Sequence, residues 1–549
     1  MPTRAQHLHT YFLFPFSIDK EAVLEAHPAM WRKGRQWIDG LDDWIEEHKA
    51  PSLSTHPMSW QRTPYTRFDM ESPAYQDMVF FHPIVRRVFF DTTGQAGSRE
   101  ALLRCYTMRP PEGGKVWFEA RDSKGRGARV EVTDLRMFLF ANGVGILSIG
   151  VEAWGLSVGD ALWINESMRK VYPSSARQIR EGRTPNHLAL ALEHGGHRSV
   201  IAEEHFENGG IVGFQPPLAK TITSLIYFAD YNQQEFEPVL DERMIVYTYL
   251  ELDPASVPDG YLESEEYQIL LSRLLTVEQA GDDYRYEPGF QKQVLDARLY
   301  RRWAHQGTYY GFTSYSNVTA ALGKFDCGDH QLLEGFLIHR MFDSRYYLMA
   351  LVALFYRATL LDFSERTALV SRRLYQGDGR LTPESIGMAD QLRSEYLHFS
   401  NYWHFRELAN KEEEIEHFEL QCRQYRIADS QHEIETEVES LDASLQRHYQ
   451  FRNTEAINRV AVLSLILGAG AVITGFFGMN FGGGFGRLFF EPEGASPAIH
   501  YVAIAAVVVF GIAALGFGAW VVLSNWRDYR GILDPRDKSL GAQSSLRRE

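Results

Sequence analysis

The chain has 549 residues, of which 45% are hydrophobic and 23% are charged, and its formal net charge at pH 7 is -15. This acidic balance argues against a general nucleic-acid binder, because neutralising phosphates requires a basic surface. It is compatible with cations as partners. The three cysteines (Cys105, Cys327 and Cys422) are too few and too scattered for a disulfide framework, and they suit a reducing compartment. Residues 1–10 lack the apolar core of a signal peptide, so we expect the start of the chain to stay in the cytoplasm.

Residues 1–330 alternate between strand-like and helix-like stretches, which predicts a cytoplasmic α+β domain with a largely antiparallel sheet. Two β-hairpins are expected, at residues 116–132 and 136–149. In the second, Asn142-Gly143 supplies the positive φ angles that a tight turn requires. Ser157, three residues before an aspartate, is typical of a helix N-terminus. Further strands are predicted at residues 11–15, 224–228 and 244–252.

Residues 331–458 are predicted to be a cytoplasmic helical stalk. Its first part contains an apolar run at residues 346–356, which is too short for the ~20 residues of a membrane span and is interpreted as a buried helix of the soluble domain. Thr382-Pro383-Glu384 is typical of a helix start. Residues 388–467 contain neither Gly nor Pro, so they favour a long helix, with a reversal near residues 401–411 as the alternative.

Two apolar stretches near the C-terminus are long enough to cross a bilayer. We expect transmembrane helices at residues 459–478 and 499–524, with an extracytoplasmic loop at 479–498 and a basic cytoplasmic tail at 525–549. Arg and Lys residues cluster before the first span and after the second, whereas the loop between the spans contains Arg487 alone. By the positive-inside rule both termini are cytoplasmic. The chain is therefore predicted to be an integral protein of the cell membrane, the inner one in a bacterium, with the lipid bilayer as a partner.

Seven positions of the first span and the helix before it recur at alternating spacings of three and four, so they share one helix face. They are Thr454, Ile457, Ala461, Ser464, Gly468, Ala471 and Gly475. In the membrane part this face is small or hydroxylated, which suits the lining of a pore. Two spans cannot enclose a pore, so several copies would have to form a ring. Close helix–helix packing is the alternative, because small residues are usual contacts between membrane helices.

The tripeptide Gly478-Met479-Asn480 follows this face directly. It stands at the end of the first span, opens the loop of a C-terminal hairpin and lies behind a long cytoplasmic helix. In this position it resembles the signature of the CorA family of magnesium and cobalt transporters, and the likeness covers roughly residues 410–530. The N-terminal region is similar only in kind and is longer than in the usual member. The resemblance implies a funnel-shaped homopentamer whose first span lines the pore and whose tripeptide ring forms the outer mouth.

Within that motif we expect Asn480 to face the ion, while Gly478 lets the chain turn and Met479 packs. Mg²⁺ surrenders its water reluctantly. A ring of neutral amide oxygens can accept hydrogen bonds from the hydrated ion and still release it, as conduction requires. A helix cap is the alternative role for Asn480. Glu491 and Glu493 would form an acidic ring around the outer entrance that concentrates cations, or they are solvated loop charges.

The resemblance also implies acidic residues between cytoplasmic protomers that sense internal Mg²⁺. Counting back along the stalk, Glu419 is the candidate regulatory ligand. A solvated helix face is the alternative reading. Four further carboxylates lie on the preceding turns: Glu412, Glu413, Glu414 and Glu416.

Two histidine-containing groups could also bind a metal, but neither has full zinc-ligand spacing, and polar loops are the simpler interpretation. One combines His194 and His197 with Glu204 and His205, and the other pairs Cys327 with His330. The sequence contains no nucleophile elbow, His-Glu-x-x-His or Rossmann fingerprint. We therefore expect no enzymatic activity and no required cofactor, with Mg²⁺ as the transported ion and a regulatory one.

Together these features predict a homopentameric channel that passes Mg²⁺, and also Co²⁺ or Ni²⁺, down the electrochemical gradient into the cytoplasm. Two alternatives stay open. One is a zinc transporter similar to the ZntB branch of the same architecture. The other is a non-conducting, membrane-anchored sensor or scaffold.

Overall fold

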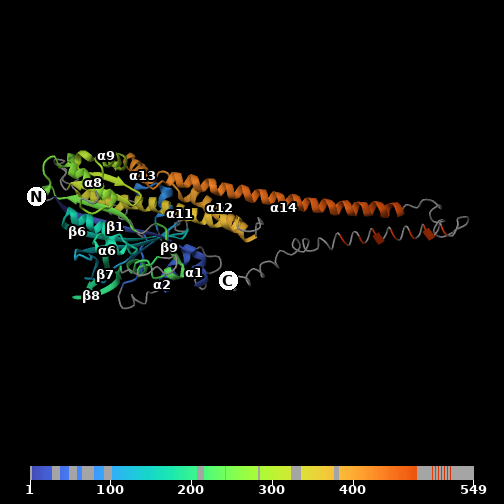
Figure 1. Ribbon diagram of the computed structural model, residues 1–549, viewed down its shortest axis with the longest axis horizontal. Coiled ribbons are helices and arrows are strands. Elements are labelled where there is room, and N and C mark those ends of the chain that lie inside the picture. Colours follow the sequence, from blue (N-terminus) through green and yellow to red (C-terminus); the bar gives the residue numbers. More distant parts are fainter. Residues whose placement is uncertain are drawn as a thin grey trace. The chain divides into compact units, whose positions relative to one another are not determined.

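The computed structural model describes residues 3–26, 37–47, 58–64, 79–91, 102–206, 216–240, 243–281, 285–322, 335–375 and 383–478, with isolated positions between 498 and 520 (Figure 1). The chain divides into two compact units, Met1–Ala443 and Ser444–Glu549. The first is a mixed α/β unit built on one large sheet. The second contains the C-terminal part of a helix that begins in the first.

The sheet runs in the order β11-β12-β13-β10-β1-β6-β5-β4-β7-β8, with β3 also paired to β5, β2 to β3 and β9 to β1. The pairing of β10 with β13 is parallel, and the other described pairings are antiparallel. The strands are β1 (Arg4–Ile18), β2 (Trp60–Arg62), β3 (Leu103–Met108), β4 (Lys115–Asp122), β5 (Gly127–Phe140), β6 (Val144–Ser157), β7 (Pro185–His194), β8 (His197–His205), β9 (Phe236–Pro238), β10 (Ile245–Leu252), β11 (Leu299–Tyr300), β12 (Tyr309–Phe312) and β13 (Ser316–Leu322).

The α-helices of the first unit lie on both faces of this sheet, and the last helix extends into the second unit. They are α1 (Lys20–Ala26), α2 (Trp37–Glu47), α4 (Pro83–Phe89), α5 (Val158–Met168), α6 (Ala176–Arg180), α7 (Lys220–Thr223), α8 (Glu265–Thr276), α9 (Pro288–Arg298), α10 (Gly335–Met341), α11 (Tyr347–Tyr375), α12 (Pro383–His398), α13 (Glu412–Gln424) and α14 (Ile427–Gly478). Two π-helical turns, Phe342–Tyr346 and Phe399–Trp403, follow α10 and α12.

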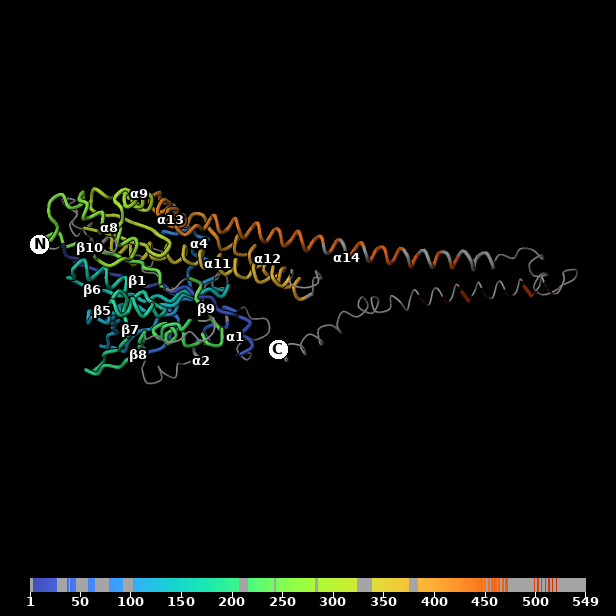
Figure 2. The backbone as a smooth tube through the Cα atoms, viewed as in Figure 1, coloured from blue at the N-terminus to red at the C-terminus, as the bar shows by residue number. Residues whose placement is uncertain are grey.

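Strand β1 lies in the middle of the sheet, between β10 and β6 (Figure 2). Nearly all of it is buried. Side chains alternate between the two faces of a strand. Thr10 points to one face, where its hydroxyl donates to Asn165 Oδ1 of α5 at 2.8 Å. Tyr11 points to the other, where its ring lies 4.4 Å from that of Tyr347 at the start of α11. The sheet is therefore the middle layer, with α5 and α11 covering opposite faces.

The two predicted hairpins are confirmed as β4–β5 and β5–β6. At the second turn only Gly143 has a positive φ, of 101°, whereas Asn142 acts through its side chain. Its amide donates to Thr359 Oγ1 at 2.9 Å and its carbonyl oxygen accepts from the Val144 backbone at 3.2 Å, so it ties the turn to α11. The predicted helix start is also confirmed: Ser157 Oγ caps α5.

The predicted strand at residues 224–228 is wrong. These residues form turns that follow α7, and Leu225, Ile226 and Phe228 are buried in the core. The Leu225 carbonyl accepts a 2.7 Å hydrogen bond from the Trp60 indole instead of from a neighbouring strand. Packing against the core has overridden the β propensity of this apolar run.

The apolar run at residues 346–356 is a buried helix, as the sequence indicated. Within the described residues, Ile338–Leu374 is the one stretch that passes as a membrane span by length and composition, and 72% of its most apolar window is buried inside the protein. Phe355 stacks on Phe140 of β5 at 4.2 Å between ring centroids. Because this helix packs against the sheet, its hydrophobicity is accounted for by the core of the first unit.

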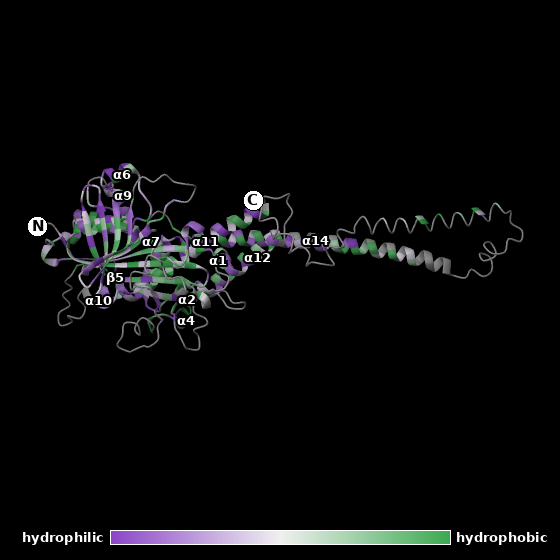
Figure 3. Cartoon of the chain, turned by 90° about the horizontal axis from the view of Figure 1, so that it is seen from below, coloured by the Kyte–Doolittle hydropathy of each residue, from purple (hydrophilic) through white to green (hydrophobic). Residues whose placement is uncertain are grey.

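The long segment without Gly or Pro is not one helix. Helix α12 begins at Pro383 as predicted, and the chain leaves helical structure at residues 404–411, where the sequence allowed a reversal. A second break separates α13 from α14, and Arg426 there has a φ of +55°. Beyond it α14 is continuous to Gly478. Figure 3 shows hydrophilic residues at its start and hydrophobic ones further along.

Candidate functional site

The seven positions of the predicted pore face all belong to α14, and its unbroken helical backbone keeps them on one side of the helix. The six whose side chains are described, from Thr454 to Ala471, are exposed. Large apolar side chains are exposed both on this face, where Ile457 is 59% exposed, and at Val460 and Leu467, which are 62% and 65% exposed. A Cβ added at Gly468 would meet nothing within 4 Å. Helix α14 therefore presents apolar surface that its own chain does not cover at these positions.

The tripeptide begins where α14 ends, at Gly478. Met479, Asn480, Glu491 and Glu493 lie outside the described residues, as do Cys327 and His330. The roles assigned to them from the sequence stay predictions.

The acidic cluster of the early stalk separates into paired and unpaired groups. Glu416 accepts from Tyr300 at 2.5 Å and from Arg302 at 3.0 Å, and Glu413 accepts from the Trp303 indole at 2.7 Å. These contacts attach α13 to the edge of the sheet near β11. Glu419 is exposed and makes no ion pair within the described residues. It is thus available to an ion or a neighbouring chain, as a regulatory ligand would have to be.

The surface histidines show a different grouping from the one considered from the sequence. His194 and His197 face each other across the exposed β7–β8 turn, away from any described carboxylate–histidine cluster. Glu204 accepts from the Lys220 backbone instead. His205 joins His187, and Glu203 lies 3.4 Å and 2.7 Å from their Nε2 atoms. This surface cluster is largely solvent-exposed.

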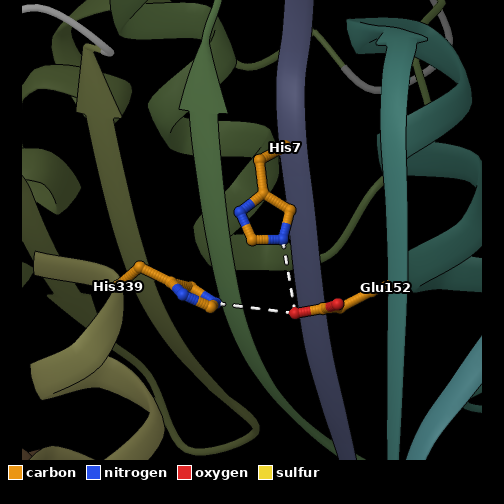
Figure 4. A group of neighbouring side chains, drawn as sticks. All are labelled: His7, Glu152 and His339. Atoms are coloured by element: carbon orange, nitrogen blue, oxygen red, sulfur yellow. Dashed lines mark ion pairs between the residues drawn. The ribbon is translucent and has the colours of Figure 1, made fainter. Parts of the chain in front are cut away.

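A second cluster, which the sequence reasoning missed, lies inside the first unit. His7 of β1, Glu152 of β6 and His339 of α10 bring their ligand-type atoms within 4.8 Å of one another (Figure 4). Glu152 Oε1 is 3.5 Å from His7 Nε2 and 3.7 Å from His339 Nε2. His9, on the same face of β1, places Nδ1 at 3.2 Å from Glu152 Oε1 and 2.8 Å from His339 Nε2. We call these four residues the buried histidine cluster.

Burial controls the protonation of this cluster. It lowers the pKa of His9 to about 3 and that of His339 to about 4, so both rings are neutral at physiological pH. The neighbouring imidazoles, that of His7 first, lower the pKa of Glu152, which keeps that carboxylate ionised. The cluster therefore combines the negative charge of Glu152 with the neutral imidazoles of His9 and His339.

Aromatic rings cover one side of the cluster, and a cavity opens on another. The Trp154 indole stacks on His7 at 3.7 Å between centroids and an angle of 4°, and the indole is itself 63% exposed. His9 and Glu152 also line a cavity of about 840 Å³. In the same cavity Arg136 forms an ion pair with Asp134. The cluster is thus shielded by Trp154 and reachable from the cavity.

One local signal pointed to this cluster. His7 and His9 are two residues apart, just before the strand predicted at residues 11–15, and because β1 already begins at Arg4 they share one of its faces. Their partner His339 is 330 residues away from His9 in the sequence, and nothing near it specifies the contact.

No protein-family model matches the sequence, and no curated protein matches it. A solved structure described as that of the full-length CmaX protein is similar at 15% identity, over 52% of this chain and 90% of that chain, with a TM-score of 0.19. A TM-score this low does not establish a shared fold.

Proposed function

We propose that this protein is a membrane channel of the CorA type, which admits divalent cations, Mg²⁺ above all, to the cytoplasm through a ring of identical copies. The observation that carries the proposal is the small-residue face of α14 leading without interruption to the Gly478-Met479-Asn480 tripeptide. An unbroken helix is what a pore lining needs, because a kink would turn part of the face away from the lumen.

The composition of that face supports a lumen between several copies. Ser464, Gly468 and Ala471 are small enough to leave space along an axis shared by neighbouring helices. The exposed Val460 and Leu467 lie at the edge of that face, since at about 100° per residue they are about 40° from Ser464 and Ala471 respectively, and a neighbouring helix of the assembly can cover them there. A helix of this kind is poorly suited to water on all sides, which favours its insertion in a bilayer as part of an assembly.

The chemistry proposed for the mouth follows from the charge of the ion. Amide oxygens from a ring of Asn480 residues receive the hydrated cation, and Glu491 and Glu493 raise its local concentration. A membrane potential supplies ~2.3 kcal/mol per charge per 100 mV, and therefore about twice that for a divalent ion. Transport needs no further energy source under an inside-negative potential.

The test is uptake of Mg²⁺, Co²⁺, Ni²⁺ and Zn²⁺ into proteoliposomes, with a matched pair of glycine substitutions in α14. A Cβ added at Gly468 or at Gly470 meets nothing within 4 Å, so neither substitution clashes at its first side-chain atom. At about 100° per residue, Gly470 is rotated roughly 200° from Gly468 around the helix axis, so only Gly468 lies on the proposed pore face. Gly468→Leu should lower uptake at least about tenfold by adding an apolar ring to the lumen, whereas Gly470→Leu should retain most of it in assembled protein.

The outcomes separate the candidate functions. Mg²⁺ uptake that is lost in Gly468→Leu and retained in Gly470→Leu supports the proposal. Uptake restricted to Zn²⁺ and dependent on a proton gradient would favour the zinc transporter. Absence of uptake for every ion by a correctly assembled protein would leave the membrane-anchored sensor or scaffold.

A further inference from the structure

We propose that His7, His9, Glu152 and His339 form an intrachain binding site for a transition-metal ion, for which Zn²⁺ is the best fit. The site lies within the first unit and does not depend on the proposed transport function. It differs from the predicted regulatory carboxylate, Glu419, both in its residues and in its ligand chemistry.

The spacing of the donor atoms fits three corners of a tetrahedral ion, because one ligand atom each of His7, Glu152 and His339 lies within 4.8 Å of the other two. His9 lies outside that group and supplies the fourth corner after a side-chain shift. With Zn–N and Zn–O bonds of about 2.0–2.1 Å, neighbouring ligand atoms lie about 3.3 Å apart. Glu152 Oε1 is 3.5, 3.2 and 3.7 Å from the nearest nitrogens of His7, His9 and His339. The 2.8 Å contact between His9 Nδ1 and His339 Nε2 has to open by about 0.5 Å, which is a small adjustment for two side chains.

The state of the nitrogen atoms also points to a ligand. Nε2 of His7, on a residue only 3% exposed, makes no hydrogen bond within the described residues although it faces Glu152 Oε1. Buried polar atoms are ordinarily satisfied, and a metal ion would satisfy this one. His9 and His339 share one proton between their facing nitrogens. When an ion takes its place, that proton moves to the outer nitrogen of its own ring, so both imidazoles stay neutral and offer their facing nitrogens to the metal.

The donor set and its surroundings select the class of metal. Three imidazoles and one carboxylate suit Zn²⁺, Co²⁺, Ni²⁺ or Cu²⁺, whereas Mg²⁺ takes oxygen ligands in an octahedron. The cavity lined by His9 and Glu152 gives an ion a route to the site. Arg136 in that cavity would repel a cation, but its charge is offset by Asp134. A bound ion would join β1 and β6 to α10.

The experiment measures Zn²⁺ affinity of the full-length protein in detergent by competition with a chelating dye, and compares His339→Ala and Glu152→Gln with His205→Ala. His205 belongs to the surface cluster and controls for adventitious binding. We expect one tight Zn²⁺ equivalent in the wild type and in His205→Ala. It should weaken about 100-fold or more in the other two variants, since even outer-shell substitutions cost 10–100-fold. Loss in His205→Ala with retention in His339→Ala would overturn the proposal.

A spectroscopic arm covers the case in which a variant folds poorly. Co²⁺ added to the wild-type protein should give the strong visible absorption of a tetrahedral ion with nitrogen ligands, and excess Mg²⁺ should leave it unchanged. Retention of that spectrum in His205→Ala supports the assignment. The weak spectrum of octahedral Co²⁺ in the wild type, or displacement by Mg²⁺, contradicts it.

Discussion

His417 of α13 should make the first unit sensitive to acid. It is 1% exposed, and neither ring nitrogen has a hydrogen-bond partner within the described residues. Its ring stacks on Tyr346 at 4.5 Å and meets the edges of Phe312 and Tyr310 at 4.6 and 5.1 Å. Burial in this aromatic pocket lowers its pKa to about 3. The folded protein therefore holds the ring neutral, whereas the unfolded chain protonates it near pH 6.5.

The sign and size of the effect follow from that difference. Above about pH 6.5 the depressed pKa of His417 does not lower the free energy of unfolding, because the ring is neutral in both states. As the pH drops from about 6.5 towards 3, the free energy of unfolding falls, because only the unfolded state gains the proton. Each pH unit in this window costs about 1.4 kcal/mol, so His417 should cost about 2 kcal/mol at pH 5.0. His417→Phe should remove this loss. It should also stabilise the protein at neutral pH by about 1–3 kcal/mol, since it removes an unsatisfied buried polar group.

The assay is thermal unfolding of the full-length protein in detergent at pH 7.5 and pH 5.0, with His432→Phe as the control. His432 is an exposed histidine of α14. The melting temperature of His417→Phe should exceed that of the wild type at both pH values, and by more at pH 5.0, while His432→Phe should follow the wild type. An unchanged gap between the two pH values would refute the assignment of a neutral, buried His417.

Three further predictions concern the membrane part and the stalk. Single cysteines at Ser496 and Ser539 should react with an impermeant thiol reagent on intact cells only at Ser496, and the reverse pattern would invert the topology. Glu419→Ala should weaken inhibition of uptake by internal Mg²⁺, whereas Glu416→Ala should chiefly lower stability, because Glu416 is paired with Tyr300 and Arg302; unchanged inhibition would remove Glu419 from the model. Asn480→Ala should abolish uptake by an assembled oligomer and Asn480→Asp should alter selectivity. Normal transport by Asn480→Ala would refute the selectivity ring, since a helix cap loses only ~1 kcal/mol of local stability.

The parts of the fold that were predictable are those encoded by neighbours in the chain. Asn142-Gly143 marks its turn because a positive φ is needed locally, and Ser157 marks a helix start because its hydroxyl caps the next residues. The helix break at Arg426 carried no such mark. Arginine rarely adopts the left-handed conformation, so no propensity rule identifies that position.

The buried histidine cluster could be predicted only in part. The pattern His7-x-His9 places two imidazoles on one face of a strand, but the face is decided by register. Here β1 pairs with β6 so that His7 lies opposite Trp154 and His9 opposite Glu152. The third element, α10, reaches the cluster through tertiary packing of segments far apart in the chain. The strand predicted at residues 224–228 failed for the same reason, since core packing decided its structure.

Because β1 is central in the sheet but first in the sequence, it is synthesised long before its neighbour β10. Thr10 of β1 and its partner Thr248 of β10 are 238 residues apart, so at 5–20 residues per second the ribosome needs about 12 to 48 seconds to supply that neighbour. During this time an apolar strand has one edge without its final partner, a condition that favours association with other chains. Both neighbours of β1, and β13 beyond them, are nevertheless synthesised before residues 459–478. The sheet can therefore close before the first predicted span leaves the ribosome, and a chaperone acting on the N-terminal segment would be needed early, ahead of membrane insertion.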